Sequence, residues 1–330
     1  MPVSELEQQI APLLAPGNAP SRSRRILRRV LIIVAVLAAT VVIAMYCASV
    51  YFVQGTFSHR VVKLIAVPAD LGLQGESVSL TSSDGVPLKA WWVPADPATG
   101  AVIVLHGMDG LDASCLLSQA KFLHEAGWST LLLDMRAHGR SGGKRIGLSL
   151  EEPRDVSAAL DWLGTQTSVK GKPQVLLGLS MGGATAICIA AFRNDVDAVI
   201  SVSSFASFDP MMGQGVQLLL GRLSILTLYG VWSPNASPLH DIPRIQPRPI
   251  LLLHGTADKQ IPVRDAYLLK QAAGPNAELW VIDGADHLVF SEDGNGKDRF
   301  DTAYREPHPE FSLSGKTPGL SSLAAVSAAG

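Results

Sequence analysis

The chain has 330 residues, of which 47% are apolar and 17% are charged. That is ample apolar material for a folded core and excludes a wholly disordered protein. Five Arg and two Glu give residues 1–29 a net charge of +3, whereas the remaining 22 basic and 27 acidic residues give −5. An acidic body argues against a nucleic-acid partner, because phosphate binding needs clustered Lys and Arg. Three Cys, at positions 47, 115 and 188, are too few for a disulfide scaffold and lack zinc-ligand spacing, so no metal site is predicted.

Residues 30–53 form an uncharged apolar run near the N-terminus. As a helix at ~1.5 Å per residue, the run reaches roughly 36 Å, enough to cross a hydrocarbon core of ~30 Å. It ends in Tyr51-Phe52-Val53, which is typical of an interfacial aromatic anchor and unlike the small-residue cleavage site of a signal peptide. We therefore expect an uncleaved transmembrane helix; the alternatives are a cleaved signal peptide and a buried core helix.

The basic residues around this run predict its orientation. Five Arg lie in residues 1–29, whereas only Arg60 and Lys63 follow the run closely. Because the side richer in Lys and Arg stays in the cytoplasm, we expect a cytoplasmic N-terminus. The body is then extracytoplasmic, in the periplasm or outside the cell.

After a short stem at 54–75, strand and helix patterns alternate along the chain. Short apolar runs predict strands at 78–80, 88–93, 101–105, 130–133, 174–179, 198–202, 250–253 and 278–282. Helical patterns fall between them, at 113–126, 151–163, 181–193 and 263–272. This alternation predicts an α/β fold with a mostly parallel sheet and helices on both faces.

A long segment, about residues 203–245, separates the sixth and seventh strands and contains an apolar stretch with helical potential at 216–229. A loop this long inside a compact domain is typical of a functional lid, and an ordinary packing excursion is the alternative. We expect the folded domain to span residues 76–290. The tail at 291–330 is poor in aliphatic residues and rich in Pro, Gly and Ser, which predicts disorder.

The strand at 174–179 runs into Gly178-Leu179-Ser180-Met181-Gly182, a G-x-S-x-G sequence followed by a helix. This context predicts a nucleophile elbow, a turn so tight that Ser180 takes a positive φ. The flanking glycines leave room where strand and helix approach each other. The helix N-terminus beneath Ser180 presents free backbone N–H groups. The alternative is a simple strand-to-helix turn.

A serine nucleophile needs a base, and the base needs an acid to fix its tautomer. His287 follows the last strand, and Asp258 follows the strand at 250–253, so both lie at the carboxyl edge of the predicted sheet. The order Ser180, Asp258, His287 is that of the α/β-hydrolase triad. Asp209 is the alternative acid.

The tetrahedral oxyanion needs backbone donors. One is the N–H of Met181, which follows the nucleophile. The other is expected in the loop after the strand at 101–105, where the N–H of Met108 is the candidate.

These residues belong to motifs that, in order, resemble those of the α/β-hydrolase superfamily: HGMDG at 106–110, DMRAHGRSGG at 134–143, GLSMGG at 178–183, and HGTADKQIP at 254–262 with GADH at 284–287. The second motif resembles the monoacylglycerol-lipase and serine-aminopeptidase branch. The block at 237–263 resembles the prolyl-oligopeptidase and dienelactone-hydrolase branches. The N-terminal layout is similar to that of membrane-anchored members with one span.

The resemblance implies an α/β-hydrolase fold with Ser180 as nucleophile, Asp258 as acid, His287 as base and no cofactor. The chain departs from the family in two places. The family usually closes with an amphipathic helix after the base, whereas residues 291–306 are mostly polar here. Ala137 stands where Gly is common in the second motif.

The expected reaction is the hydrolysis of a carboxylic ester through an acyl-enzyme, with thioester and amide substrates left open. The apolar segment at 216–229 and the anchor favour a lipid or acyl ester, as in a lysophospholipase-like enzyme, over other small molecules. Two alternatives remain: an acyltransferase that uses the same triad with an alcohol acceptor, and a non-catalytic binding module tethered to the membrane.

Overall fold

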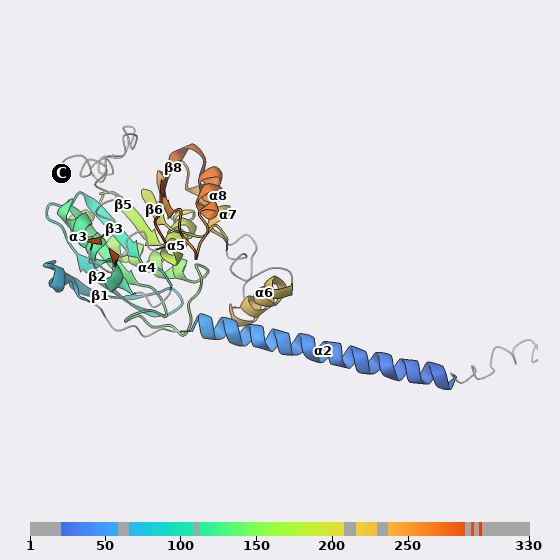
Figure 1. Cartoon of the computed structure of the whole chain (residues 1–330). Coiled ribbons are helices and arrows are strands. Elements are labelled where there is room, and N and C mark those ends of the chain that lie inside the picture. Colours follow the sequence, from blue (N-terminus) through green and yellow to red (C-terminus); the bar gives the residue numbers. More distant parts are fainter. Residues whose placement is uncertain are drawn as a thin grey trace, which may run out of the picture.

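The computed structural model describes residues 21–58, 66–108, 112–207, 216–229 and 237–287, with the short pairs β9 (Glu292–Asp293) and β10 (Lys297–Asp298). Within these ranges, one large sheet forms the centre of the body, and a long helix projects from it (Figure 1). The alternative acid Asp209 and almost all of the tail at 291–330 lie outside the described residues, as do residues 288–291, where the closing helix of the family would begin.

Eight strands make up the central sheet, at the positions that the sequence predicts. They are β1 (Glu76–Thr81), β2 (Pro87–Val93), β3 (Gly100–Leu105), β4 (Trp128–Asp134), β5 (Gln174–Leu179), β6 (Ala198–Val202), β7 (Ile250–Gly255) and β8 (Ala277–Ile282). Their order across the sheet is β1-β2-β4-β3-β5-β6-β7-β8. The β1–β2 and β2–β4 pairs are antiparallel, and every pair from β4 to β8 is parallel. The prediction of a mostly parallel sheet is confirmed.

Helices cover both faces of this sheet, as predicted. One face carries α4 (Glu152–Leu163), α5 (Met181–Ala190) and α8 (Arg264–Ala273), with the short helices α7 (Pro238–Asp241) and η5 (Ile242–Ile245). The other face carries α3 (Leu117–Glu125), preceded by η2 (Ala113–Leu116). Three further short 3₁₀ helices are η1 (Pro68–Leu71), η3 (Thr167–Val169) and η6 (Gly274–Asn276).

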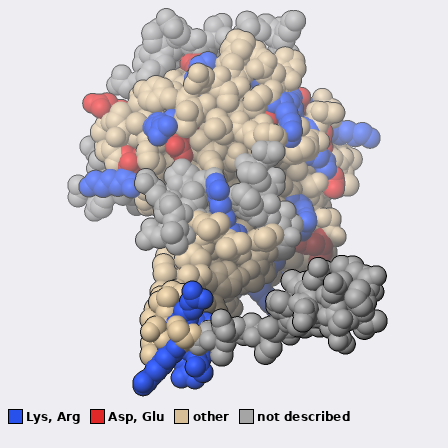
Figure 2. All heavy atoms as spheres, turned by 90° about the vertical axis from the view of Figure 1, so that its right-hand side faces the viewer, with Lys and Arg blue, Asp and Glu red and all other residues tan. Residues whose placement is uncertain are grey.

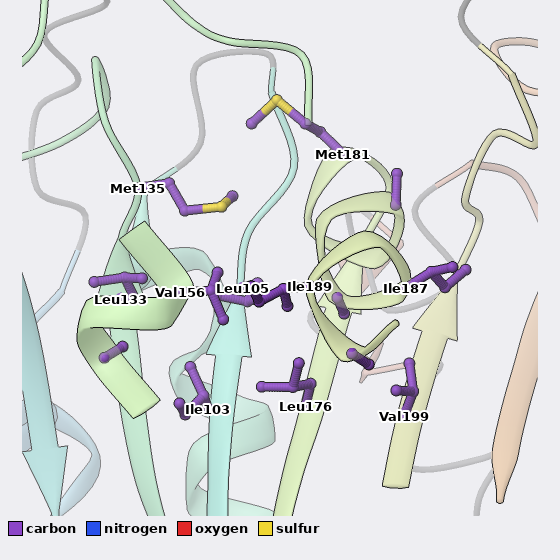
Figure 3. Packing of buried hydrophobic residues seen from close by; sticks show 14 of the residues in the cluster. Ile103, Leu105, Leu133, Met135, Val156, Leu176, Met181, Ile187, Ile189 and Val199 are labelled. Atoms are coloured by element: carbon purple, nitrogen blue, oxygen red, sulfur yellow. The ribbon is translucent and has the colours of Figure 1, made fainter. Parts of the chain in front are cut away.

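The central strands separate two apolar cores because successive side chains of a strand point to opposite faces. In β3, Ile103 and Leu105 point to the face where Val156 of α4 and Ile189 of α5 lie (Figure 3). Val102 and Val104 point to the opposite face, toward α3. A strand buried on both sides consists of a nearly continuous apolar run, and for this reason the sequence alone predicts β3 to β7.

The N-terminal helix α2 (Arg22–Thr56) is longer than the predicted span at 30–53 and contains all of it. Its 35 residues reach about 52 Å at ~1.5 Å per residue. Its most apolar 18-residue window has a mean hydropathy of 2.9, and none of that window is buried. By length and composition, this is the one helix among the described residues that is able to cross a membrane. The N-terminal end of α2 lies far from the body (Figure 1), and its first two turns carry five Arg; Figure 2, viewed from that side, shows basic side chains gathered there.

The C-terminal end of α2 packs against the body. Residues 59–65, which belong to the stem predicted at 54–75, lie outside the described residues. Val53 and Phe57 are buried in the core that contains α4 and α5. The backbone N–H of Ile146 donates to the carbonyl oxygen of Phe57 at 2.8 Å. The helix end is therefore fixed to the loop that follows β4.

The segment predicted as a lid, about 203–245, contains α6 (Val216–Tyr229), α7 and η5. Residues 208–215 and 230–236 of this segment lie outside the described residues. Helix α6 packs beside the body-proximal part of α2 (Figure 1). The apolar stretch predicted to be helical at 216–229 is confirmed as a helix.

The close packing of β5 against α5 generates a stability prediction. A Cβ added at Gly178 would lie 2.2 Å from the carbonyl carbon of Gly182. We expect Gly178→Ala to lower the free energy of unfolding by about 3 kcal/mol, because the backbone of α5 must move. The matched control is Gly164→Ala at the end of α4, where the nearest atom would lie 3.5 Å away and a change within about 1 kcal/mol is expected. Thermal unfolding of the detergent-solubilised chain measures both, and equal melting temperatures would contradict this packing.

Candidate active site

Ser180 lies on the sharp turn between β5 and α5. Its backbone has φ 54° and ψ −116°, which confirms the positive φ predicted from the sequence. The backbone N–H of Ser180 donates to the carbonyl oxygen of Val202 at 2.7 Å, so neighbouring strand β6 holds the turn in place. A non-Gly residue with such a backbone conformation is destabilised by about 1–3 kcal/mol, so contacts with the surrounding structure must enforce the conformation.

The glycines of the G-x-S-x-G sequence allow the close approach on which this turn depends. A Cβ at Gly182 would lie 2.3 Å from the carbonyl oxygen of Leu105 in β3. A Cβ at Gly183 would lie 2.7 Å from Oγ of Ser201 in β6. Helix α5 therefore begins in contact with two strands at once, and only glycine fits there.

The parallel register brings three loops together at the carboxyl edge of the sheet. Leu179 pairs with Val202, Val202 with Leu253, and Gly255 with Ile282, so β5, β6, β7 and β8 end side by side. Strand β3 lies between β4 and β5, so the order in which strands are added to the sheet changes direction at β3. In open α/β sheets, ligands bind outside the carboxyl ends of the strands at such a point. Ser180 follows β5 at this position.

Ser180, His287 and Asp258 form a continuous hydrogen-bonded chain. Nε2 of His287 lies 2.9 Å from Oγ of Ser180, and Nδ1 of His287 lies 2.8 Å from Oδ2 of Asp258. An ionised carboxylate accepts only, so Nδ1 carries the proton and Nε2 is free to accept from the hydroxyl of Ser180. The Asp258 side chain is fully buried, whereas 9% of the His287 side chain is exposed.

The carboxylate of Asp258 has donors on both oxygens. Oδ1 accepts the backbone N–H groups of Gln260 and Ile261, each at 2.8 Å. Oδ2 faces Nε2 of His254 at 3.2 Å in addition to His287. Burial on its own would raise the pKa of Asp258, but the hydrogen bonds from His254, His287 and Ile261 hold that pKa well below its usual value. Asp258 is therefore ionised at neutral pH.

The two residues predicted to supply oxyanion donors belong to different parts of the fold. Met181 is the first residue of α5, at the positive end of the helix dipole. Met108 lies in the loop after β3, and its carbonyl oxygen faces Nε2 of His138 at 2.9 Å. The neighbouring His106 is fully buried, and Nε2 of its ring accepts the backbone N–H of Met135 at 3.1 Å. Burial lowers the pKa of His106 to about 3, and His138 acts in the same direction, so the His106 ring is neutral.

A second polar network contacts the carbonyl oxygen of Met181. The hydroxyl oxygens of Thr185 and Ser149 lie 2.8 Å and 3.2 Å from the carbonyl oxygen of Met181. Ser149 belongs to a loop whose backbone N–H groups, from Gly147 and Ser149, donate to buried Glu152 at 2.5 Å and 2.7 Å. Burial raises the pKa of Glu152 to about 7. The loop before α4 is thereby tied to the start of α5.

The three residues singled out from the sequence, Ser180, Asp258 and His287, lie together in the structure. The sequence alone does not identify the residues that hold their loops in place. The contact of His254 with Asp258 could have been found from their spacing of four residues after β7. The role of His138 has no such signal, because the ring acts on a loop 30 residues away in sequence. Glu152 acts on the loop directly before it, at Gly147 and Ser149, but no pattern in the sequence indicates a buried carboxylate there. Ala137, noted as a departure from the family, has φ 59° and is fully buried. Among the described residues, no cluster of three or more His, Cys, Asp or Glu side chains is arranged to hold a metal ion.

The comparisons with known proteins agree with this architecture. The family model described as serine aminopeptidase, S33, matches residues 96–237. The protein YfhR of Escherichia coli (strain K12) is 30% identical over 251 residues, covering 74% of this chain and 82% of the relative. The chain belongs to the α/β-hydrolase superfamily. The resemblance predicted from the four motifs and the predicted fold class are both confirmed, and the chain is a hydrolase by family.

Two further relatives bear on activity and location. The esterase Pf2001 of Pyrococcus furiosus has a similar structure, with a TM-score of 0.59 and 26% identity, covering 75% of this chain and 93% of that one. A Saccharomyces cerevisiae protein whose name is membrane protein YNL320W is 28% identical over 212 residues, covering 63% of this chain and 70% of the relative.

The environment of Asp258 generates a pH prediction. A carboxylate with a lowered pKa in the folded state stabilises that state above the unfolded pKa of about 4, and this stability is lost as the pH falls through the folded pKa. We expect the melting temperature of Asp258→Asn to lie below that of the wild type by a constant gap from pH 8 to about 5. The gap should narrow below about pH 4, where the wild type begins to lose this contribution.

Calorimetry of both proteins across this pH range measures the gap. Asp283→Asn is the matched control, because Asp283 lies on the neighbouring loop with an exposed side chain. It should change the free energy of unfolding at pH 7 by no more than about 0.5 kcal/mol. Equal melting temperatures for the wild type and Asp258→Asn at pH 7 would contradict a stabilising role of the ionised Asp258 carboxylate.

Proposed function

We propose that this protein is a serine hydrolase that cleaves a carboxylic ester through an acyl-enzyme. The observation that carries the proposal is the 2.9 Å contact between Oγ of Ser180 and Nε2 of His287, backed by the 2.8 Å contact between His287 and Asp258. A hydroxyl within hydrogen-bond reach of an imidazole, itself oriented by a buried carboxylate, is the arrangement that activates a serine nucleophile. The structural similarity to the esterase Pf2001 supports an ester as substrate.

In the proposed reaction, Oγ of Ser180 attacks the carbonyl carbon while Nε2 of His287 takes the hydroxyl proton. The carbonyl oxygen becomes an oxyanion, which accepts hydrogen bonds from the backbone N–H groups of Met108 and Met181. His287 then gives its proton to the leaving alcohol, and the C–O bond breaks to leave the acyl-enzyme. Water, deprotonated by His287, attacks the acyl carbon; the bond from that carbon to Oγ of Ser180 breaks, His287 returns the proton to Oγ, and the carboxylic acid leaves. Asp258 stays ionised throughout and stabilises the imidazolium.

We also propose that α2 anchors this hydrolase in a membrane, with the Arg-rich end in the cytoplasm and the catalytic domain outside it. Support comes from the length and apolar composition of α2, from the basic side chains at its far end, and from the similarity to YNL320W. The proposed substrate is a small molecule or a lipid that carries an acyl ester.

The first prediction concerns an activated serine. A fluorophosphonate probe should label the full chain in a membrane fraction, and Ser180→Ala should abolish labelling and lower kcat/KM for an acyl ester by at least about 10⁴-fold. Ser203→Ala is the matched control, because Ser203 follows β6 as Ser180 follows β5 and also has a positive φ, 49°. It should retain labelling.

Product analysis of the same sample separates the alternatives. A hydrolase releases the free acid whether or not an alcohol is added, whereas an acyltransferase forms the new ester when the alcohol is present. Acyl anilides test the amide activity that the family description suggests. A folded wild-type chain that neither labels nor turns over any of these substrates would overturn the enzymatic proposal and leave a binding module.

The second prediction concerns orientation. Tyr267→Cys on α8 and Ser23→Cys at the start of α2 place thiols on the two sides of the proposed membrane, and both positions are exposed. In Cys47→Ser chains expressed in bacterial spheroplasts, a membrane-impermeant maleimide should label position 267 without lysis and position 23 only after lysis. The reverse pattern would show that the body lies in the cytoplasm.

A further inference from the structure

Helix α6 is apolar on two sides, although only one of them packs into the body. On the inward side, Ile225 and Tyr229 are buried in the core that contains α4 and α5, and Leu220 and Ser224 are buried as well. The other side carries three exposed leucines, with exposed fractions of 57%, 41% and 45% at Leu219, Leu223 and Leu226. Their spacing of four and three residues places them on one face of the helix, which we call the leucine face. A helix that bounds a protein against water normally has a polar outer face.

The leucine face adjoins the apolar surface of α2. The hydroxyl of Tyr46 contacts Oγ1 of Thr227, and Oγ of Ser224 donates to Oγ of Ser49 at 3.0 Å. These two contacts fix α6 beside α2, as Figure 1 shows. The nearby aromatic side chains of α2, Tyr51 and Phe52, have exposed fractions of 80% and 70%. Both helices therefore expose apolar side chains near the C-terminal end of α2.

The position of these contacts along α2 sets the depth of α6 in the proposed bilayer. A hydrocarbon core of ~30 Å corresponds to about 20 helical residues, so a core that begins after Arg29 ends near Ser49. Tyr46, Ser49 and the aromatic residues that follow then lie at the outer lipid–water boundary, where Tyr side chains are favoured. Because α6 contacts α2 at these residues, α6 lies at the same depth.

The carboxyl edge of the sheet lies on the same side of the body. Helix α2 ends against the loop after β4, through the hydrogen bond from Ile146 to Phe57. The hydroxyl of Tyr229 in α6 donates to the carbonyl oxygen of Ile146 at 2.6 Å. Ser149 of the same loop contacts the carbonyl oxygen of Met181, next to Ser180. Both apolar helices are thus tied to the loop that supports the candidate active site.

We propose that α6 is a second membrane-contacting element, with its leucine face inserted into lipid at the outer boundary beside α2 and the carboxyl edge of the sheet turned toward the bilayer. The partner is a lipid surface, and the substrates within reach are esters whose acyl chain stays in the membrane. The single charged residue of α6, Arg222, suits this position, because a long basic side chain reaches the headgroups from a partly inserted helix. This inference rests on the proposed anchoring by α2.

Continuity with α2 favours lipid over a protein partner. None of the most apolar window of α2 is buried against the body, so in a membrane that surface faces acyl chains. The leucine face lies beside it at the boundary. A protein covering the leucine face would have to displace lipid from the neighbouring surface of α2 as well.

Spin-label accessibility in vesicles tests the proposal on the full chain. Nitroxide labels are placed at Leu223→Cys and, as a second variant, Leu226→Cys, in vesicles of phosphatidylethanolamine and phosphatidylglycerol. Only Cys47 needs replacement by Ser, because burial raises the pKa of the Cys115 thiol to about 12 and also raises that of Cys188, which leaves both unreactive. Val36→Cys in α2, with 58% of its side chain exposed, reports on the anchor. Tyr267→Cys on α8 is the water-facing control.

We expect the labels at 223 and 226 to collide with oxygen several-fold more, relative to a water-soluble nickel chelate, than the label at 267 does. Accessibility at 223 and 226 equal to that at 267, with the label at 36 in lipid, would overturn the inference and leave the anchor in place. Labels shielded from both reagents would show a protein partner and would also overturn it. A water-accessible label at 36 would instead overturn the anchoring on which the inference rests.

Discussion

Helix α5 begins so close to β3 and β5 that its first turn has no room for a side chain at Gly182 or Gly183. The rest of the site depends on this contact. It forces the chain to turn within one residue, which places Ser180 in a strained conformation with its hydroxyl at the edge of the sheet. It also buries all ten residues of α5, so the first N–H groups of the helix lie in a low-dielectric environment where they stabilise negative charge strongly.

Buried histidines hold the loops around this turn. His106 connects the loop after β3 to the start of the next loop at Met135, and His138 connects that loop back to Met108. His254 lies 2.9 Å from the carbonyl oxygen of Ile261 and so closes the loop that carries Asp258. Each ring joins two parts of the chain through a hydrogen bond to a backbone group. The loops of the site are therefore fixed to one another as well as to their own strands, which keeps the donors and acceptors near Ser180 in position.

The sequence predicts the sheet and the residues of the candidate site because short local patterns of residues indicate both. Strand β3 is apolar along its whole length and β5 along all of it after Gln174. Ser180 directly follows β5, and Asp258 and His287 lie within five residues of the ends of β7 and β8. The supporting contacts are different in kind. Tyr46 meets Thr227, and Ser224 meets Ser49, across more than half the chain, and no periodicity links these positions. The true length of α2 also escapes prediction, because its basic first turns and its end at Thr56 are helical without being apolar.

The direct attachment of α2 to the body has a consequence for reach. Because Phe57 is buried and hydrogen-bonded to Ile146, the end of α2 is fixed to the body. With α2 in the proposed membrane, this contact would hold the body close to the bilayer surface. A flexible tether would let a catalytic domain sample a large volume and meet substrates at many distances. A domain fixed directly to the proposed anchor would instead meet substrates only in a thin layer parallel to the membrane, in which diffusion is two-dimensional. Selection among esters would then begin with their distance from the bilayer centre, before any contact with the site.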